Sequence, residues 1–139
     1  MDDIKRLVEE AVKAREFAYA PYSRFAVGAA LQTVSGKIYT GCNIESASYS
    51  PSNCAERTAF FKAVSEGERK FLRIAIVGGA QGEPIHELCP PCGVCRQVMM
   101  EFCNPKTFRI ILASGDDECR SFTLEELLPQ GFGPDNLHE

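Results

Sequence analysis

The chain has 139 residues, with 15 lysines and arginines against 19 aspartates and glutamates, so its formal charge is −4. Its 45% hydrophobic and 24% charged residues exclude a disordered chain, and no apolar run approaches the roughly 18 residues of a membrane span. The acidic balance argues against a nucleic-acid partner, because phosphate backbones are bound by basic surfaces. The length fits a single domain over residues 1–139. The start, MDDIKRLVEE, is charged and unlike a signal peptide, so we expect a cytoplasmic protein with no membrane partner.

The hydrophobic pattern predicts a mixture of helices and strands. Helices are expected where apolar residues recur at three- and four-residue spacing, and strands where short apolar runs lie between turn residues. In chain order the expected elements are a helix at 3–18, strands at 25–31 and 37–42, a loop at 43–53, a helix at 54–66, a strand at 72–77, a helix at 95–102, strands at 108–113 and 118–122, and a short helix from 123. The tail from Gln130 onward is too rich in glycine and proline for regular structure.

Local signals refine these elements. Asp2 or Asp3 is expected to cap the first helix, Gly115-Asp116 to form a turn, and Thr123-Leu-Glu-Glu126 to form a capping box. The first two strands are expected to pair as an antiparallel hairpin, and the segment 72–113 to form a right-handed parallel crossover. We therefore expect an α/β fold of three layers, α/β/α, around a mixed sheet of about five strands.

Cysteine is unusually frequent. There are seven cysteines, an odd number, and three of them lie in Cys89-Pro-Pro-Cys92-Gly-Val-Cys95. In a reducing compartment such thiols are expected to be metal ligands or small buried groups. Cys92 and Cys95 begin one expected helix and Cys54 begins another, where the helix N-terminus stabilises thiolates. If the two helices pack side by side, the three thiolates form a zinc site whose fourth position stays open, as in catalytic zinc sites.

Glu56 follows Cys54 by two residues, on the first turn of the same expected helix. A carboxylate there could take a proton from zinc-bound water and return it to a substrate nitrogen. The next residue, Arg57, could donate to the thiolates and offset the net charge of −1 that Zn²⁺ with three thiolates carries. An ordinary capping box, Asn53-x-x-Glu56, is the alternative explanation for this glutamate.

Three other interpretations of the cysteines remain open. Cys92-x-x-Cys95 on its own also suits a redox motif or a structural zinc knuckle, and Cys89 would complete a closed, purely structural four-cysteine site. The simplest expectation for the remaining thiols is burial as small apolar groups. Those thiols are Cys42, Cys103 and Cys119.

Over nearly its whole length the chain resembles the cytidine deaminases of the small, homotetrameric type. The motifs that carry the resemblance are Ala20-Pro-Tyr-Ser-x-Phe25-x-Val-Gly-Ala-Ala-Leu31, Gly41-x-Asn43-x-Glu45, Cys54-Ala-Glu-Arg57 and Pro91-Cys-Gly-x-Cys-Arg-Gln97. The resemblance implies one Zn²⁺ per subunit, held by Cys54, Cys92 and Cys95, with Glu56 moving protons.

The resemblance also implies a substrate site. Phe25 would pack against the pyrimidine, and Asn43 and Glu45 would hydrogen-bond the ribose hydroxyls. Ala55 would be a further substrate contact, and Phe132 would complete the site of a neighbouring subunit. Without the resemblance, Phe25 could equally be a core residue and the two polar residues ordinary loop side chains.

The implied reaction is zinc-dependent hydrolysis of cytidine and 2′-deoxycytidine to uridine and 2′-deoxyuridine with release of ammonia, in pyrimidine salvage. Zinc-bound hydroxide would attack C4 of the ring. Two alternatives remain: a deaminase of another aminopyrimidine compound, which shares this zinc signature, and a zinc-stabilised binding module without catalysis.

Overall fold

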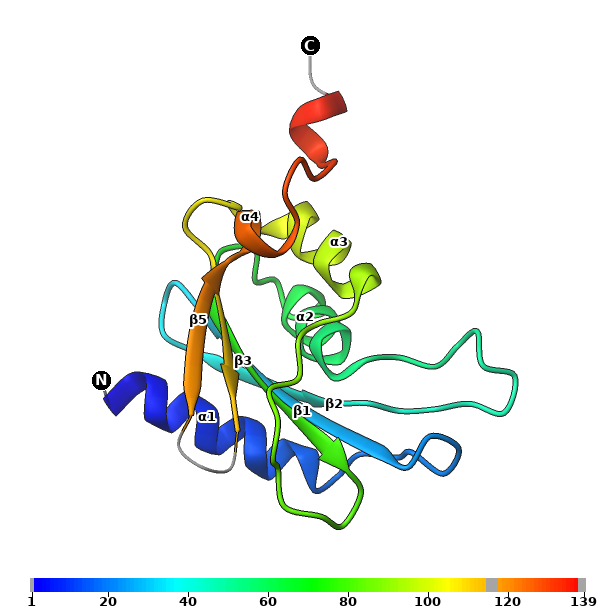
Figure 1. The fold of residues 1–139 in the computed structure, drawn as a ribbon. Coiled ribbons are helices and arrows are strands. Elements are labelled where there is room, and N and C mark those ends of the chain that lie inside the picture. The colour runs from blue at the N-terminus through cyan, green and yellow to red at the C-terminus, as the bar shows by residue number, and fades with distance from the viewer. Residues whose placement is uncertain (1, 115–117, 138–139) are drawn as a thin grey trace.

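The computed structural model describes residues 2–114 and 118–137, so the expected turn at Gly115-Asp116 lies outside the described residues. Figure 1 shows a twisted sheet with helices on both sides. Its elements are α1 (Asp2–Arg15), β1 (Phe25–Thr33), β2 (Ile38–Cys42), α2 (Ala55–Ser65), β3 (Phe71–Ala80), α3 (Gly93–Phe102), β4 (Arg109–Ala113), β5 (Cys119–Thr123), α4 (Leu124–Leu127) and a short 3₁₀ helix (Pro134–Leu137).

The five strands form one mixed sheet in the order β2-β1-β3-β4-β5. β1 pairs antiparallel with both β2 and β3, and β4 pairs antiparallel with β5. β3 and β4 are parallel and are joined through α3. The expected hairpin, the parallel crossover and the five-stranded mixed sheet are therefore confirmed.

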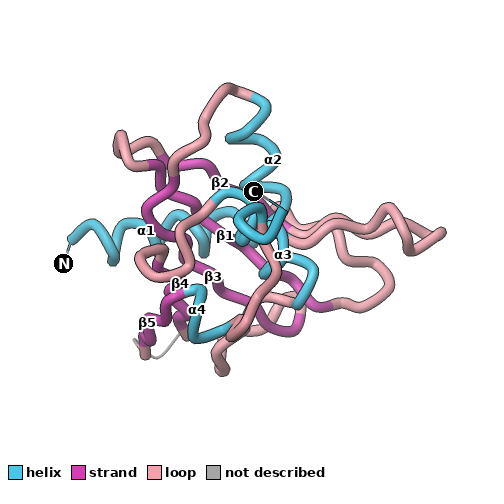
Figure 2. Tube along the Cα trace, turned by 90° about the horizontal axis from the view of Figure 1, so that it is seen from above, coloured by secondary structure: helices cyan, strands magenta, loops and turns pink. Residues whose placement is uncertain are grey.

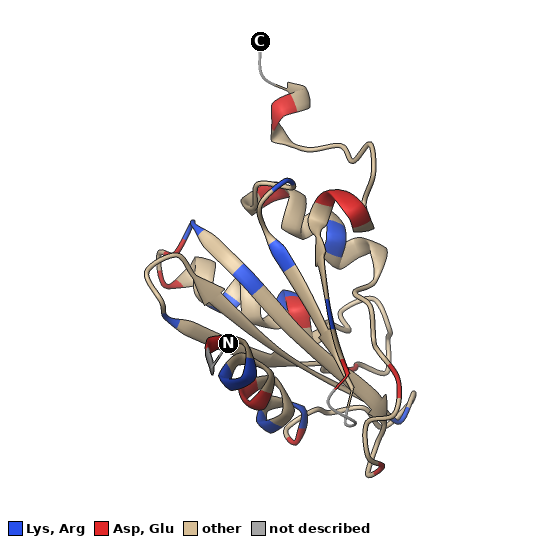
Figure 3. Cartoon of the chain, turned by 60° about the vertical axis from the view of Figure 1, so that its left-hand side comes forward, with Lys and Arg blue, Asp and Glu red and all other residues tan. Residues whose placement is uncertain are grey.

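Helices cover both faces of the sheet, which confirms the three-layer α/β/α arrangement (Figures 1 and 2). On one face α1 packs Leu7 onto small residues such as Ala75, while its outer side carries charges of both signs (Figure 3). On the other face α2 and α3 pack Phe60 and Met99 onto the isoleucines of β3. The continuous apolar runs of β1 and β3 follow from this burial on both faces, since neighbouring residues point to opposite layers.

Some expected boundaries were wrong. α1 ends at Arg15, not at residue 18, because the chain tightens into turns in which the amides of residues 16–18 bond to carbonyls three residues earlier. Asp2 and Asp3 lie inside α1 and are not its cap. The tail does contain a 3₁₀ helix, and the Asn136 side chain accepts from the Gly133 amide just before it. The capping box at Thr123 and Glu126 is confirmed.

The start of α2 lies directly against β2. A Cβ added at Gly41 would lie 2.4 Å from the carbonyl oxygen of Ala55, so only glycine permits this approach. The loops 17–24 and 43–53 project together from one end of the sheet (Figures 1 and 2), and Tyr19 and Ile44 form a β-bridge between them. Within the residues described, no helix is long and apolar enough to cross a membrane.

Candidate active site

Three thiols meet where α2 and α3 begin. Cys54 is the N-cap residue of α2 and Cys92 that of α3, both with extended backbone, and Cys95 lies on the first turn of α3. The Sγ atoms of Cys54 and Cys92 are 3.6 Å apart, and the Cys95 amide donates to the Cys92 Sγ at 3.5 Å. All three sulfurs lie within 4.8 Å of one another, so this group could hold a metal ion.

Cys89 does not belong to this group in the described part of the chain. Its thiol packs against the backbone of β3, since a Cβ added at Gly78 would lie 2.8 Å from its Sγ. Burial raises the pKa of the Cys89 thiol to about 12. The closed four-cysteine site is therefore not formed in this structure.

Glu56 lies on the first turn of α2, with only 4% of its surface exposed. Burial, with a smaller contribution from the neighbouring Cys54 thiolate, raises the pKa of this carboxyl to about 7. The capping-box explanation is wrong: the N-cap of α2 is Cys54, with no side-chain cap, and the Asn53 amide donates to Thr58 Oγ1. Glu56 is thus a buried carboxyl beside the three thiols, without a capping role.

Arg57 points back at the thiols. Its Nη2 donates to the Cys54 Sγ at 3.4 Å, and among the described residues its Nε is a buried donor with no hydrogen-bond partner. The Cys95 thiol, followed by the Arg57 guanidinium, lowers the pKa of Cys54 to about 5 against the opposing effect of burial. The same pairing with Cys54, together with burial, raises the pKa of Cys95.

The donor set suits zinc. Thiolates are ligands that Zn²⁺ prefers, and two helix N-termini with one guanidinium offset the negative charge that three thiolates bring together. The described part of the chain adds no fourth protein ligand to the group, which matches the open coordination of a catalytic zinc site.

The residues expected to contact substrate lie at the end of the sheet from which the two loops project. The Phe25 side chain is 44% exposed at the start of β1, so its interpretation as a core residue is wrong. It lines a cavity of about 420 Å³ together with the end of β3 and the loop that follows. Glu45 accepts from the amides of Tyr22 and Ser23 and from the Ser23 hydroxyl, which lowers the pKa of its carboxyl.

Two expected contacts are placed differently. The Ala55 side chain is fully buried in the core, so only its backbone could face a substrate. Phe132 lies in the C-terminal segment, where its ring is 57% exposed and its carbonyl accepts from Gln97 on α3. Beyond it the chain extends away from the body of the molecule (Figure 1).

Two residues that the sequence interpretation did not single out also belong to this region. Arg96, directly after Cys95, donates to the carbonyls of Pro91 and Leu127 and so holds the turn that carries Cys92. An arginine directly after a cysteine expected to bind zinc is a sequence signal that could have indicated this role. Tyr49 is 71% exposed with a φ of 64°, and its ring meets that of Tyr22 edge-on, a contact that no sequence pattern indicates.

The other thiols fit only partly with expectation. Cys103 is buried and Cys42 half-buried, but Cys119 is exposed at the start of β5, the edge strand of the sheet over the described residues.

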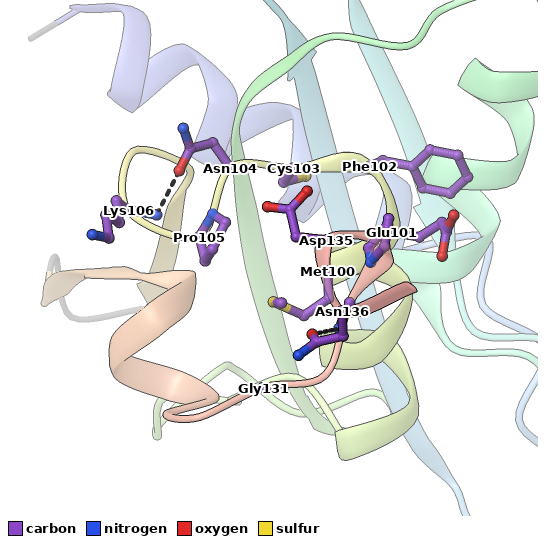
Figure 4. A pocket seen from close by; sticks show the side chains of 12 residues that line it. Met100, Glu101, Phe102, Cys103, Asn104, Pro105, Lys106, Gly131, Asp135 and Asn136 are labelled. Atoms are coloured by element: carbon purple, nitrogen blue, oxygen red, sulfur yellow. Dashed lines mark hydrogen bonds between the residues drawn. The ribbon is translucent and has the colours of Figure 1, made fainter. Parts of the chain in front are cut away.

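A second cavity, of about 530 Å³, lies between the end of α3 and the C-terminal segment (Figure 4). Its asparagines are engaged by backbone amides: Asn104 accepts from Lys106 and Asn136 from Gly133. Neither the three clustered thiols nor any residue expected to contact substrate lines it, so it is separate from the candidate active site.

A three-thiol group and a buried glutamate at two helix starts, on one face of an α/β/α sheet, define the zinc-dependent deaminase class of enzyme. In agreement, residues 1–111 match the family model described as the cytidine and deoxycytidylate deaminase zinc-binding region. The chain belongs to the cytidine and deoxycytidylate deaminase family, and its cofactor is zinc, one ion per chain.

Individual relatives agree. The cytidine deaminase of Sporosarcina psychrophila is 49% identical over 135 residues, covering 97% of this chain and 95% of the relative. That of Halalkalibacterium halodurans is 47% identical over 137 residues, covering 99% of each. The crystal structure of cytidine deaminase from Burkholderia pseudomallei superposes with a TM-score of 0.84 at 48% identity, covering 92% of this chain and 98% of that one. The expected family and fold are therefore confirmed.

Proposed function

We propose that this chain is a cytidine deaminase that hydrolyses cytidine and 2′-deoxycytidine to uridine and 2′-deoxyuridine with release of ammonia. The observation that carries the proposal is the carboxyl of Glu56, buried to 4% exposure directly beside the three-thiol group. A zinc-stabilised module without catalysis would give no purpose to a buried, uncapped carboxyl at this position.

Cys54, Cys92 and Cys95 would hold the zinc ion, which supplies a Lewis acid that activates water. Glu56 moves the protons: its carboxyl takes one from the attacking water and gives it to N3 of the ring, then takes the second from the new C4 hydroxyl and delivers it to the departing amine. A C4–O bond forms, the C4–N bond breaks, and ammonia leaves. A carboxyl whose pKa lies near 7 can both accept and donate at neutral pH.

Arg57 assists without touching the substrate. Three thiolates bring three negative charges to an ion with two positive ones, which weakens the ion as a Lewis acid. By donating to the Cys54 Sγ, the guanidinium withdraws part of this charge.

The substrate would lie against Phe25, with Asn43 and Glu45 hydrogen-bonding the ribose hydroxyls and the Ala55 backbone facing the ring. The exposure of Phe25 and the position of Asn43 and Glu45 on the chain beside it support this arrangement. A site that pairs with hydroxyls discriminates strongly against free cytosine, because its polar groups would otherwise be left without partners.

The proposal includes a homotetramer in which Phe132 completes the site of a neighbouring subunit. The exposed ring of Phe132, close to the C-terminus, supports this. It also includes a single catalytic domain over residues 1–139, supported by two apolar clusters that flank one sheet, and a cytoplasmic role in pyrimidine salvage. A reducing compartment suits a site made of free thiols.

The test is the ultraviolet absorbance of cytidine incubated with the zinc-loaded protein, run beside Glu56→Ala and Glu101→Ala. Glu101 is an exposed glutamate on α3 and serves as the matched control. We expect the wild type and Glu101→Ala to shift the spectrum to that of uridine and Glu56→Ala, with zinc retained, to leave it unchanged. An unchanged spectrum with zinc-loaded wild type would contradict the proposal.

A further inference from the structure

β1 extends beyond its neighbour at the end that carries Phe25. The last pair in the β1–β2 ladder joins Gly28 to Cys42, while β1 itself begins at Phe25. Beyond this pair, the Asn43 backbone amide still donates to the Val27 carbonyl at 3.3 Å, but β2 offers no backbone partner to the Val27 amide or to the Phe25 carbonyl. Unpaired backbone groups at a strand end are normally left to water, or to side chains that replace the missing strand.

Here a side chain replaces it. Asn43, the residue directly after β2, donates from Nδ2 to the Phe25 carbonyl at 2.7 Å and accepts at Oδ1 from the Val27 amide at 2.9 Å. A neighbouring strand would offer one N–H and one C=O to these two backbone groups. The side-chain amide of Asn43 supplies both in its place. The amide still keeps one N–H and one lone pair for another partner, so a ribose contact is compatible with it.

Two more side chains bind the same stretch of backbone. The Ser23 hydroxyl accepts from the Phe25 amide at 3.1 Å and itself donates to Glu45. From α1, Arg15 Nε donates to the Ala26 carbonyl at 3.0 Å. The same guanidinium also donates to the carbonyls of Ala80 and Glu83, two further residues that line the cavity of Phe25.

We propose that Asn43, Ser23 and Arg15 are positioning residues that hold the backbone of Phe25 and thereby place its ring for the pyrimidine. This inference rests on the proposed function, in which the ring of Phe25 packs against the base. Its consequence is that sugar recognition and base packing are coupled, because Asn43 and Glu45 both reach Phe25 through hydrogen bonds. At this end β1 is paired only with β3, through Phe25 and Ala80, so the side toward β2 depends on these side chains to hold the backbone that carries the exposed ring.

The experiment is a double-mutant cycle on kcat/KM for cytidine, with Asn43→Ala made in the wild type and in Phe25→Ala. If Asn43 also acts through Phe25, we expect the loss, mainly through KM, to be at least about fivefold larger in the wild type than in Phe25→Ala, where only the ribose contact remains to be lost. If Asn43 only binds a ribose hydroxyl, both backgrounds lose the same factor, and equal losses would overturn the inference.

Ser23→Ala removes the hydroxyl that accepts from the Phe25 amide and donates to Glu45, and it provides a second cycle should Asn43→Ala fail to fold. We expect a loss that is at least about threefold larger in the wild type than in Phe25→Ala, whereas equal losses again contradict the inference. Ser65→Ala is the control, because it removes a serine hydroxyl that is hydrogen-bonded to backbone, here by donating to the Lys62 carbonyl, at an exposed site on α2. A wild type that leaves cytidine unchanged overturns the proposed function, and this inference with it; equal losses in an active enzyme overturn only the inference.

Discussion

One chain brings the three thiols together in a compact group, whereas it leaves the two aromatic rings expected to contact the substrate exposed. The three sulfurs lie within 4.8 Å of one another, and Glu56 beside them is almost fully buried. By contrast, Phe25 is 44% exposed and Phe132 57% exposed. The groups that would carry the chemistry are thus preorganised inside one subunit, while the groups that would hold the substrate present open surface. This difference is what the proposed sharing of sites between subunits would explain.

Removing zinc tests the first half of this comparison and should have the largest effect. Because the three thiols join the starts of α2 and α3, a chelator should lower kcat/KM by more than about 10⁴-fold and also lower Tm. Metal analysis, a cytidine assay and thermal unfolding follow the change, and added Zn²⁺ should restore both properties. Full activity in protein shown to be metal-free would contradict the assignment of zinc to this cluster.

Arg57→Ala should have a smaller effect and separates zinc binding from zinc tuning. We expect kcat to fall by about 10- to 100-fold while one zinc per chain is retained, since the guanidinium donates to a thiolate and is not itself a ligand. Steady-state kinetics and metal analysis of the same preparation check this. Arg120→Ala, an exposed arginine on β5, is the control, and an unchanged kcat in Arg57→Ala would show that charge withdrawal has no role.

Much of the three-thiol group and its glutamate could be predicted from the sequence, because their relative positions depend on local helix geometry. Cys92 and Cys95 are three residues apart at a helix start, and the position of Glu56 relative to Cys54 is fixed by a single helical turn. Only the side-by-side packing of α2 and α3 had to be assumed, and the sheet topology supplies it by placing both helices on one face.

The substrate half could not be predicted in the same way. That Asn43 binds the backbone of Phe25 follows from where β2 stops relative to β1, an offset between strands that no spacing within either segment encodes. The exposure of Cys119 likewise follows from the position of β5 at the sheet edge. In both places the environment of the residue depends on which strand lies next to it in the sheet, and residue type alone does not indicate that.

Phe132→Ala tests the second half of the comparison. If its ring completes a neighbouring site, the variant should raise KM for cytidine about tenfold with little change in zinc content. Hybrids assembled from Phe132→Ala and Glu56→Gln subunits should regain activity, because some sites then combine an intact Glu56 from one chain with an intact Phe132 from another. Light scattering that reports a monomer, or hybrids with no gain over the separate variants, would contradict sharing.

Cys89→Ser should have the smallest effect, and it asks whether the thiol group is closed or open. The Cys89 thiol packs on Gly78 and lies outside the three-sulfur group, so we expect zinc content to stay at one per chain and kcat/KM to change by less than about twofold. A modest loss of thermal stability is expected, because a hydroxyl replaces a thiol in a mostly buried position. Loss of both zinc and activity would instead make Cys89 a fourth ligand. That outcome would leave no open position beside Glu56, and the buried carboxyl would then have no water to deprotonate.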